Sequence, residues 1–568
     1  MFLKDYKKET VLAPLFKMLE AGFELFVPLV MAAVIDRGIA QSDIPYVLKM
    51  GGVLVLLGLI GLTCSITAQY FAAKAAVGFS TKMKHALFEH IQELSFSEMD
   101  TLGTSTMITR MTSDANQVQN GVNMVLRLFL RSPFIVFGAM VMAFTIDLKA
   151  ALVFVVTIPL LSIVVFGIMM ITMPLYKKVQ AGLDKVLGKT RENLTGVRVI
   201  RAFHKEEQES AEFEQSNSAL THMQLFVGKI SALTNPVTYI IVNVATIVLI
   251  YTGAVRVDTG HITQGEVVAL VNYMSQILIE LVKLANLIIT ITKALACANR
   301  IQSVFELQSS MEWNEQTGVQ SAQDGASPYV VEFDHVGLTY QGAGAESLSD
   351  IDFKVKKGQT VGIIGGTGSG KSSLVHLIPR FYDATRGTVR IDGKDVKNYG
   401  MEELRNKIGM VMQKAVLFQG TIRENLCWGK PDASTEEMNR ALEISQAKEF
   451  VDTKPKGLDE PVAQGGKNLS GGQRQRLTIA RAVVKQPEIL ILDDSASALD
   501  YATDARLRKA IREMEEKTTV FIVSQRTSSI QYADQIIVLE DGRIVGLGTH
   551  DELLQSCEVY QEIHYSQA

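Results

Sequence analysis

A glycine-rich segment with one lysine offers the clearest chemistry in this sequence. Residues 365–372 read Gly-Gly-Thr-Gly-Ser-Gly-Lys-Ser, which satisfies the spacing G-x-x-x-x-G-K-[ST]. An apolar run, Val361–Ile364, precedes the segment and a helical stretch, Ser373–Ile378, follows it. In such a strand–loop–helix, backbone N–H groups wrap phosphate oxygens at the helix N-terminus. We expect Lys371 to reach the β- and γ-phosphates of a nucleotide and the Ser372 hydroxyl to coordinate Mg²⁺.

Two further motifs carry groups suited to phosphoryl transfer. The apolar run Ile489–Leu492 ends in Asp493 and Asp494. An acidic residue at the tip of such a strand holds Mg²⁺ in P-loop ATPases. Between the two aspartates and the glycine-rich loop lies Leu469-Ser-Gly-Gly-Gln473, followed by Arg474-Gln-Arg476. Together these motifs predict an ATP-hydrolysing domain.

The remainder of the chain has a different composition. Of its 568 residues 47% are hydrophobic, and the excess lies almost entirely before residue 292, which predicts a membrane half and a soluble half. The net charge of −4 argues against nucleic acid as a partner, because phosphate backbones need a positive face. The four cysteines lack CxxC spacing, so neither a zinc site nor a disulfide framework is indicated.

Six apolar stretches are long enough to cross a bilayer, which takes about 20 residues. They are Leu12–Ile35, Gly51–Ala72, Leu130–Ile146, Ala151–Pro174, Leu233–Val255 and Val267–Ile291. The first is interpreted as an uncleaved span. Two connections, Lys74–Arg131 and Tyr176–Lys229, are long and basic, whereas the others are short and poor in lysine and arginine. The positive-inside rule places both long connections and both termini in the cytoplasm.

The long connections have helical periodicity, so we expect the membrane helices to continue beyond the bilayer. Each pair of helices should turn at a cytoplasmic tip, one near Met111–Gln119 and one near Asn193–Phe203. These tips could contact a cytoplasmic domain.

Three carboxylates lie in or beside the spans, where an unpaired charge is costly. Glu24 is hypothesised to face a cavity and to favour cationic compounds. The alternative is structural: Glu20 lies at the wet boundary and Glu280 pairs with Lys283. Three methionines could form an adaptable pocket wall or only fill space: Met169, Met170 and Met173.

The glycine-rich loop, the LSGGQ segment and the Asp-tipped strand, in this order, resemble the motifs of ABC transporter ATPases. With six spans before them, they resemble the half-transporter of multidrug-type, type IV ABC exporters. The resemblance implies a multi-domain membrane protein with an all-α six-helix transmembrane domain and an α/β P-loop nucleotide-binding domain. The expected boundaries are 1–305 for the first, 306–328 for a linker and 329–568 for the second.

The resemblance also implies site residues and the cofactors ATP and Mg²⁺. Tyr340 matches the aromatic residue that stacks on adenine, and Gln413 matches the glutamine that senses Mg²⁺. Ser497-Ala-Leu-Asp500 matches the D-loop. The implied nucleotide-binding residues are Tyr340, Gly365, Gly366, Thr367, Gly368, Ser369, Gly370, Lys371, Ser372, Ser373, Ser470, Gly471, Gly472, Gln473 and Asp500. The implied metal ligands are Ser372, Gln413 and Asp493, and the implied catalytic residues are Asp494, Gln525 and Gln413.

Two positions depart from the family pattern, and both concern hydrolysis. The family has a glutamate as general base where this chain has Asp494, and a histidine where it has Gln525. In the family each ATP lies between one chain's glycine-rich loop and the other chain's LSGGQ, so Ser470 and Gly472 would cap the partner's nucleotide. We expect a heterodimer in which this chain contributes the degenerate site. A slow homodimer is the alternative.

The predicted function is ATP-driven export of amphipathic, drug-like compounds across a bacterial cytoplasmic membrane. The expected partners are a second, different half-transporter, the lipid bilayer and an amphipathic substrate. Alternatives are a dedicated lipid, peptide or siderophore transporter, or a membrane sensor of ATP occupancy that moves no solute.

Overall fold

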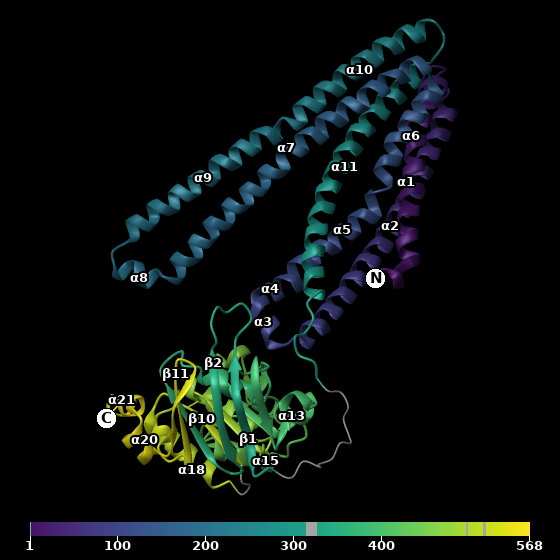
Figure 1. The fold of residues 1–568 in the computed structure, drawn as a ribbon. Helices are drawn as coiled ribbons and strands as arrows, with labels where there is room; N and C mark the ends of the chain where they lie inside the picture. The colour runs from purple at the N-terminus through teal and green to yellow at the C-terminus, as the bar shows by residue number, and fades with distance from the viewer. Residues whose placement is uncertain (1, 314–326, 496–497, 515–517, 568) are drawn as a thin grey trace. The chain divides into compact units, whose positions relative to one another are not determined.

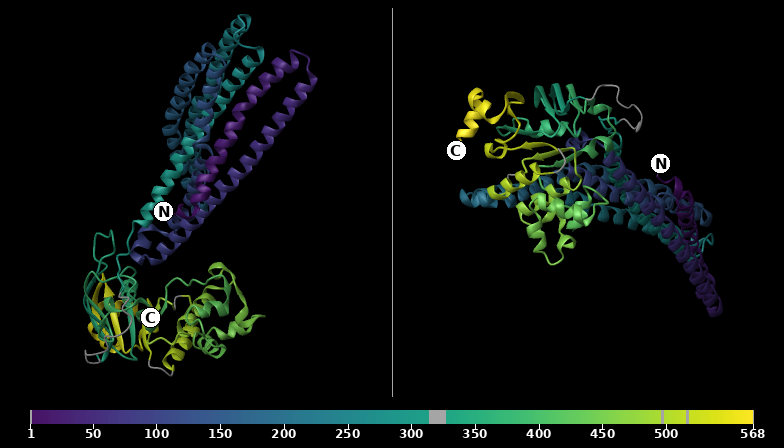
Figure 2. Two further views of the ribbon diagram at one scale, coloured as in Figure 1. Left: turned by 90° about the vertical axis from the view of Figure 1, so that its right-hand side faces the viewer. Right: turned by 90° about the horizontal axis from the view of Figure 1, so that it is seen from below.

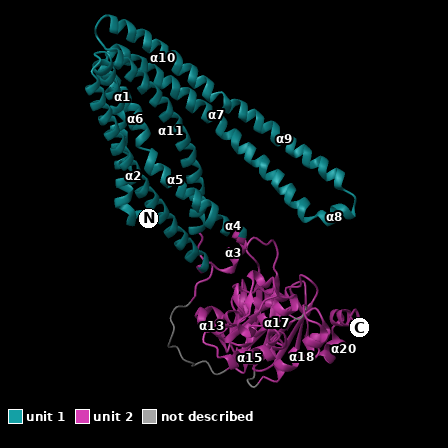
Figure 3. Cartoon of the chain, turned by 180° about the vertical axis from the view of Figure 1, so that it is seen from behind, with its two compact units in different colours: residues 1–92, 105–306 teal, residues 93–104, 307–568 magenta. Residues whose placement is uncertain are grey.

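The structure, a computed structural model, describes residues 2–313, 327–495, 498–514 and 518–567. It divides into two compact units, coloured separately in Figure 3. The N-terminal unit comprises Met1–Gln92 and Ser105–Glu306, and the C-terminal unit comprises Glu93–Thr104 and Leu307–Ala568. Most of the predicted linker, residues 314–326, lies outside the described residues.

The N-terminal unit is helical, and its long helices meet near one end and spread apart toward the other (Figures 1 and 2). Its main helices are α1 (Lys7–Ala33), α2 (Ile44–Glu93), α5 (Ala115–Leu128), α6 (Arg131–Ile146), α7 (Leu148–Thr195), α9 (Glu206–Ala232), α10 (Thr234–Asp258) and α11 (Gln264–Phe305). Among the described residues, six helical segments are long and apolar enough to cross a membrane, which confirms the six predicted spans. At 50 residues, α2 is about 75 Å long, well beyond the hydrocarbon thickness of about 30 Å. The helices therefore extend past the bilayer, as predicted.

The first predicted tip is wrong and the second is confirmed. The chain turns not at Met111–Gln119 but at the short helix α3 (Phe96–Leu102), which ends at Gly103 with a positive φ of 72°. Met111–Gln119 continues a helical path because Asp114 within it pairs with Arg300 of α11 at 2.6 Å and holds it against that helix. The second turn lies at α8 (Val197–Ala202), inside the predicted Asn193–Phe203.

The short connections of the N-terminal unit meet at one end of the helices. The Asp36 carboxylate, after α1, accepts hydrogen bonds from the Thr263 hydroxyl at 2.5 Å and from the Gly265 N–H at 2.8 Å, before and within α11. The Arg256 guanidinium near the end of α10 donates to Asp147, between α6 and α7, at 3.0 Å. These contacts agree with a bundle whose short connections all lie on one side of the membrane.

A group of charges, two of them buried, joins α1, α6 and α11. The Arg131 guanidinium on α6 donates to Glu24 of α1 and to Glu280 of α11, each at 2.7 Å. Glu280 also accepts from the Ser132 hydroxyl at 2.7 Å and from Lys283 at 2.8 Å. Arg131 and Glu280 are buried. We call these five residues the charge cluster; its two carboxylates are matched by two cations.

The charge cluster shows how two of the three membrane carboxylates are paired. Glu24, which was hypothesised to face a cavity, pairs with Arg131 at 2.7 Å while its side chain stays 41% exposed. The alternative pairing of Glu280 with Lys283 is confirmed. Glu20 pairs with Lys17 at 2.6 Å.

The C-terminal unit is an α/β domain built on two main sheets (Figure 1). The larger sheet has the strand order β12-β11-β3-β10-β9-β6. Its strands are β12 (Arg543–Gly548), β11 (Gln535–Glu540), β3 (Thr360–Gly365), β10 (Thr519–Val523), β9 (Ile489–Asp493) and β6 (Ile408–Val411). The smaller sheet, in the order β2-β1-β4-β5, consists of β2 (Leu348–Lys356), β1 (Tyr329–Leu338), β4 (Arg386–Ile391) and β5 (Lys394–Asp395). A short pair joins β7 (Gly420–Thr421) to β8 (Pro461–Val462).

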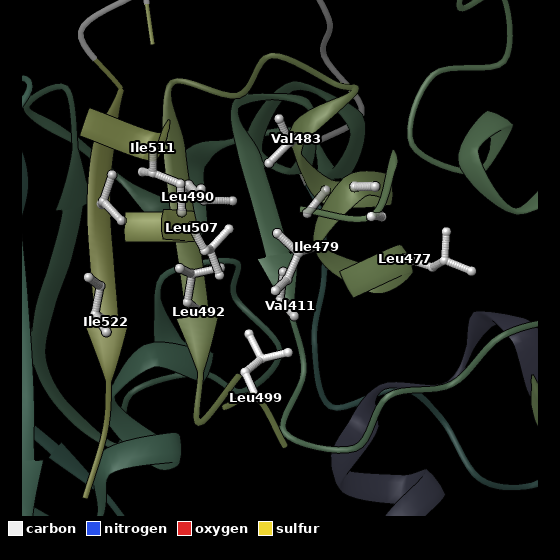
Figure 4. Close-up of a cluster of buried hydrophobic side chains, with 14 of the residues drawn as sticks. Val411, Leu477, Ile479, Val483, Leu490, Leu492, Leu499, Leu507, Ile511 and Ile522 are labelled. Atoms are coloured by element: carbon white, nitrogen blue, oxygen red, sulfur yellow. The ribbon is translucent and has the colours of Figure 1, made fainter. Parts of the chain in front are cut away.

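Some helices of this unit pack on the larger sheet, and others pack on those helices. They are α12 (Lys371–Leu377), α13 (Met401–Lys407), α14 (Ile422–Cys427), α15 (Thr435–Ile444), α16 (Lys448–Asp452), α17 (Gly471–Val483), α18 (Tyr501–Arg512), α19 (Thr527–Ile530), α20 (His550–Ser556) and α21 (Glu558–Tyr565). Figure 4 shows Leu490 and Leu492 of β9 among Ile479 of α17 and Leu507 of α18. Every residue of β9, Ile489–Asp493, is buried, as expected for a central strand of a parallel sheet.

Loss of Arg131 should destabilise the N-terminal unit, because it leaves the buried Glu280 with less compensation. Arg131→Ala should cost about 3–5 kcal/mol, the range measured when one member of a buried ion pair is removed. Lys283→Ala is the matched control. Its side chain is 43% exposed, so its loss should cost about 0–1 kcal/mol. Denaturation of the full chain in detergent micelles, followed by circular dichroism, measures both. Equal losses of stability would contradict a structural role for Arg131.

Candidate active site

Parallel pairing brings the two ends of the predicted site together. Val523 of β10 pairs with Ile363 of β3 on one side and with Asp493 of β9 on the other. Because the three strands are parallel, their carboxyl ends lie at one edge of the sheet. The loop after β3 and Asp493 at the end of β9 therefore sit two strands apart. Ligands of open α/β sheets bind at this kind of edge.

The loop between β3 and α12 has the backbone of a phosphate cradle. Gly368 and Gly370 have φ values of 85° and 94°, which favour glycine. A side chain on Gly370 would also lie 2.9 Å from the Ser347 carbonyl oxygen. The Lys371 ammonium donates to the carbonyl oxygens of Gly365 at 2.9 Å and Gly366 at 2.6 Å. These two hydrogen bonds hold the Lys371 side chain against the start of the loop.

The residues expected to hold Mg²⁺ are close to one another. The Ser372 hydroxyl donates to the Asp493 carboxylate at 3.0 Å, and the Gln413 side chain lines the same cavity. Asp493 is buried. Mg²⁺ prefers oxygen ligands and is usually held by one or two carboxylates together with substrate phosphates. The three side chains supply such oxygens, so they fit the ion.

A cavity of about 650 Å³ unites the predicted segments. It is lined by Ala343, Ala345, Glu346, Ser347, Thr367, Gly368, Gly370, Lys371, Ser372, Ser373, Gln413, Asp493, Asp494, Val523, Ser524, Gln525, Asp541 and Gly542. The volume suits a small-molecule ligand. Sequence reasoning missed two groups of these residues: those between β1 and β2, and Asp541-Gly542 between β11 and β12. The strand order, which places β11 beside β3, brings Asp541-Gly542 to the cavity, and no motif marks either group.

Asp494 occupies a strained position beside the cavity. Its φ is 47°, and its N–H donates to the Val523 carbonyl at 3.1 Å. The Gln413 amide lies 3.4 Å from its carboxylate. Burial raises the pKa of Asp494 above its ordinary value, although Gln413 and the nearby Lys371 oppose the shift. Burial also lowers the pKa of Lys371, against the attraction of the two aspartates.

Other predicted residues lie elsewhere in the C-terminal unit. The Tyr340 hydroxyl donates to Ser373 at 2.9 Å, and the Tyr340 ring stands perpendicular to that of Tyr382 at 5.0 Å. Ser470 caps α17 and, with Gln473, forms a capping box. Asp500 caps α18. The cavity is not lined by any of these predicted residues: Tyr340, Ser470, Gly471, Gly472, Gln473 and Asp500. Ser497 of the predicted D-loop lies outside the described residues.

Comparisons with known proteins agree with both units. Residues 10–281 match the sequence family described as the ABC transporter transmembrane region, and residues 348–497 match the family described as ABC transporter. An uncharacterized ABC transporter ATP-binding protein of Mycobacterium tuberculosis is 37% identical over 100% of this chain and 97% of its own length. The Bacillus subtilis protein YgaD, for which multidrug export is the proposed role, is 33% identical over 99% of this chain and 97% of its own length. A solved bacterial Atm1-family ABC exporter with ATP bound shares the fold, with a TM-score of 0.80 at 23% identity over 99% of this chain and 98% of that one.

The raised pKa of Asp494 predicts a pH-dependent stability. Above that pKa the ionised carboxylate is disfavoured by burial, so Asp494→Asn should raise the melting temperature of the chain at neutral pH without nucleotide. As the pH falls through the raised pKa, Asp494 takes up a proton in the folded state and the advantage of asparagine should disappear. Scanning fluorimetry between neutral and acidic pH measures the difference.

Asp500→Asn is the matched control, with the opposite sign. The Thr503 backbone N–H and hydroxyl hold the pKa of Asp500 below its ordinary value, so its charge stabilises the folded state at neutral pH. That stability is present above the unfolded pKa and is lost as the pH falls through the folded pKa. Asp500→Asn should therefore lower the melting temperature. A shift of the same sign for both variants would refute the assignment of Asp494.

Proposed function

The chain belongs to the ABC transporter family, and on that premise we propose that it exports amphipathic compounds across a bacterial cytoplasmic membrane. It is a multi-pass membrane protein with an ATPase domain of the ABC type. YgaD supports the multidrug assignment. The long basic connections support cytoplasmic termini and a cytoplasmic ATPase domain.

One observation carries this proposal: the turn between α2 and α5, residues 93–104, belongs to the C-terminal unit (Figure 3). The same unit holds the proposed nucleotide cavity. Phe96 of α3 packs on Phe381 with ring centroids 4.6 Å apart. The Tyr382 hydroxyl donates to Asp100 of α3 at 2.5 Å. Residues that are continuous with two membrane helices are thus fastened to the ATPase domain.

A series of contacts continues from α3 to the nucleotide cavity. Tyr382 meets Tyr340 edge to face at 5.0 Å, and Tyr340 donates to Ser373 in the first turn of the helix after the phosphate loop. Burial, and then the carboxylate of Asp100, raise the pKa of Tyr382, so its hydroxyl remains protonated and keeps donating at physiological pH. Nucleotide binding at Ser373 can therefore move α3 and the helices that continue from it. We call Tyr382 and Tyr340, which connect Asp100 to Ser373, the tyrosine link.

Each cavity residue has a role in this proposal. The glycine-rich loop would bind the phosphates of ATP, with Lys371 turning from the loop carbonyls to the β- and γ-phosphates. Ser372, Gln413 and Asp493 would hold Mg²⁺, which supplies charge neutralisation between the phosphates. Tyr340 would stack on adenine.

Hydrolysis within this chain's own site should be slow. A general base must come within about 2.6–3.2 Å of the proton that it removes, and Asp494 is one methylene shorter than glutamate. Gln525 lines the cavity but cannot carry an imidazole's charge. Ser470 and Gly472 do not line the cavity, which supports a site completed by a second chain. We propose that the second chain is a different half-transporter with a competent glutamate and histidine.

The first test concerns hydrolysis. The purified chain alone should show little ATPase activity. Asp494→Glu with Gln525→His should raise the activity of the chain alone by about 10²-fold or more, the usual contribution of a positioned acid–base group. Addition of Lys371→Ala to that double variant is the control and should remove the gain. Vigorous turnover by the unaltered chain alone would rule out the heterodimer.

The second test concerns coupling. Tyr382→Phe keeps the ring of the tyrosine link and removes its hydrogen bond to Asp100. ATP-dependent uptake of an amphipathic dye into inside-out vesicles should fall several-fold, with ATPase activity largely retained. Tyr399→Phe is the matched control, because its hydroxyl donates to the Ile391 carbonyl at 2.8 Å, away from α3. If vesicles with the natural partner chain take up no dye at all, the chain is a sensor and not a transporter.

A further inference from the structure

The N-terminal unit contains a second large cavity, of about 780 Å³. It lies between α7, the junction of α9 with α10, and α11. Its lining residues are Val165, Ile168, Met169, Thr172, Met173, Tyr176, Lys177, Val179, Gln180, Ser231, Thr234, Asn235, Val282, Ala285, Asn286, Ile289, Thr292, Lys293 and Ala296. Pockets for small molecules have volumes of about 300–1,000 Å³. This cavity is large enough for an amphipathic compound.

The lining of the cavity changes in polarity along its length. Val165 and Val282 lie within the apolar spans, whereas Lys177 and Lys293 follow the ends of these spans on the basic, cytoplasmic side. From Val165 to Lys177 the α7 axis rises about 18 Å at 1.5 Å per residue. An apolar body could therefore lie at one end while a polar head lies at the other.

The polar end is positive. Lys177 and Lys293 line the cavity, and no aspartate or glutamate does. Within the described part of the chain neither lysine forms an ion pair with a carboxylate. The other polar side chains at this end, including Gln180 and Asn286, are uncharged. An anionic head would find two lysine ammonium groups there, whereas a cationic head would be repelled.

The apolar end of the cavity can adapt to compounds whose apolar parts differ in shape. Met169 and Met173 are partly exposed and line the cavity. Their unbranched, polarisable side chains fill irregular space and accept different shapes. Of the two interpretations left open, the cavity favours the adaptable wall for Met169 and Met173, whereas Met170 does not line the cavity.

The carboxylates of the spans do not reverse this preference. Glu24 and Glu280, which would attract cations, are neutralised within the charge cluster by Arg131 and Lys283. Neither lines the cavity. The expected preference of Glu24 for cationic compounds is therefore unsupported.

We propose that this cavity binds amphipathic anions: compounds with an apolar body and a carboxylate, phosphate or sulfonate head held by Lys177 and Lys293. This inference rests on the proposed export function, since it names the substrate class of the membrane unit. The anion enters from the inner leaflet or from the cytoplasm. Both sources share the same chemistry.

A binding experiment without ATP tests the inference. The full chain is placed in phosphatidylcholine nanodiscs and titrated with dansyl-labelled undecanoate, its neutral methyl ester and the matching alkyl ammonium. Dansyl fluorescence reports the dissociation constants, corrected with empty discs. The carboxylate should bind at least tenfold more tightly than either of the other probes. Equal affinity for all three, or preference for the ammonium, would overturn the proposal.

Variants locate the binding site. Lys177→Gln with Lys293→Gln should remove the tenfold preference and leave the affinity for the ester unchanged. Lys178→Gln is the matched control: it also removes an exposed lysine from α7, but Lys178 does not line the cavity. Loss of the preference in Lys178→Gln, or its survival in the double variant, would place the anion elsewhere and overturn the proposal. If the double variant does not fold, the relative affinities of the unaltered chain for the three probes still test the proposal.

Two further arms identify the source of the anion and separate this inference from the export function. Displacement of the carboxylate probe by phosphatidylglycerol in the discs indicates a lipid ligand, and displacement by unlabelled undecanoate alone indicates a water-borne one. Displacement by neither would overturn the proposal. Selective binding without ATP-driven uptake would refute export and leave the cavity assignment standing. ATP-driven uptake without selectivity among the three probes would support export and refute the assignment of the cavity to anions.

Discussion

The parallel ladder of β3, β10 and β9 is the constraint on which the catalytic chemistry of this protein depends. Its register sets Val523 against both Ile363 and Asp493. A shift of one residue would turn every side chain of a strand to the opposite face. It would carry Asp493 away from Ser372 and disperse the proposed magnesium ligands. The complete burial of β9 holds this register.

The C-terminal unit is more than an ATPase because it includes a piece of the membrane half of the sequence. Residues 93–104 group with it, and the tyrosine link joins Asp100 of this segment to Ser373 beside the phosphate loop. Side chains with few rotatable bonds transmit displacement better than long flexible ones, since less entropy is lost in ordering them. Two tyrosines in contact suit that role.

Charge is distributed differently at two places in the N-terminal unit. In the charge cluster, Arg131 and Lys283 balance Glu24 and Glu280, so these charges hold three helices together and exert little net attraction on a solute. In the second cavity, Lys177 and Lys293 are not balanced by any lining carboxylate. Neutralised charge suits structure, and unbalanced charge beside apolar surface suits recognition.

The sequence by itself determined the six spans and the segments around Lys371, Asp493 and Gln525 that meet at one cavity, because hydrophobic length and short motifs are local properties. It misplaced the first tip, since only the packing of Asp114 against Arg300 decides where that helix continues. It also missed Asp541-Gly542, which reach the cavity through the order of strands. The partner of Glu24 was equally hidden, because Arg131 lies 107 residues away in the chain. Tertiary structure alone decided these points, since contacts between distant residues depend on how helices and strands pack and leave no periodic pattern in the sequence.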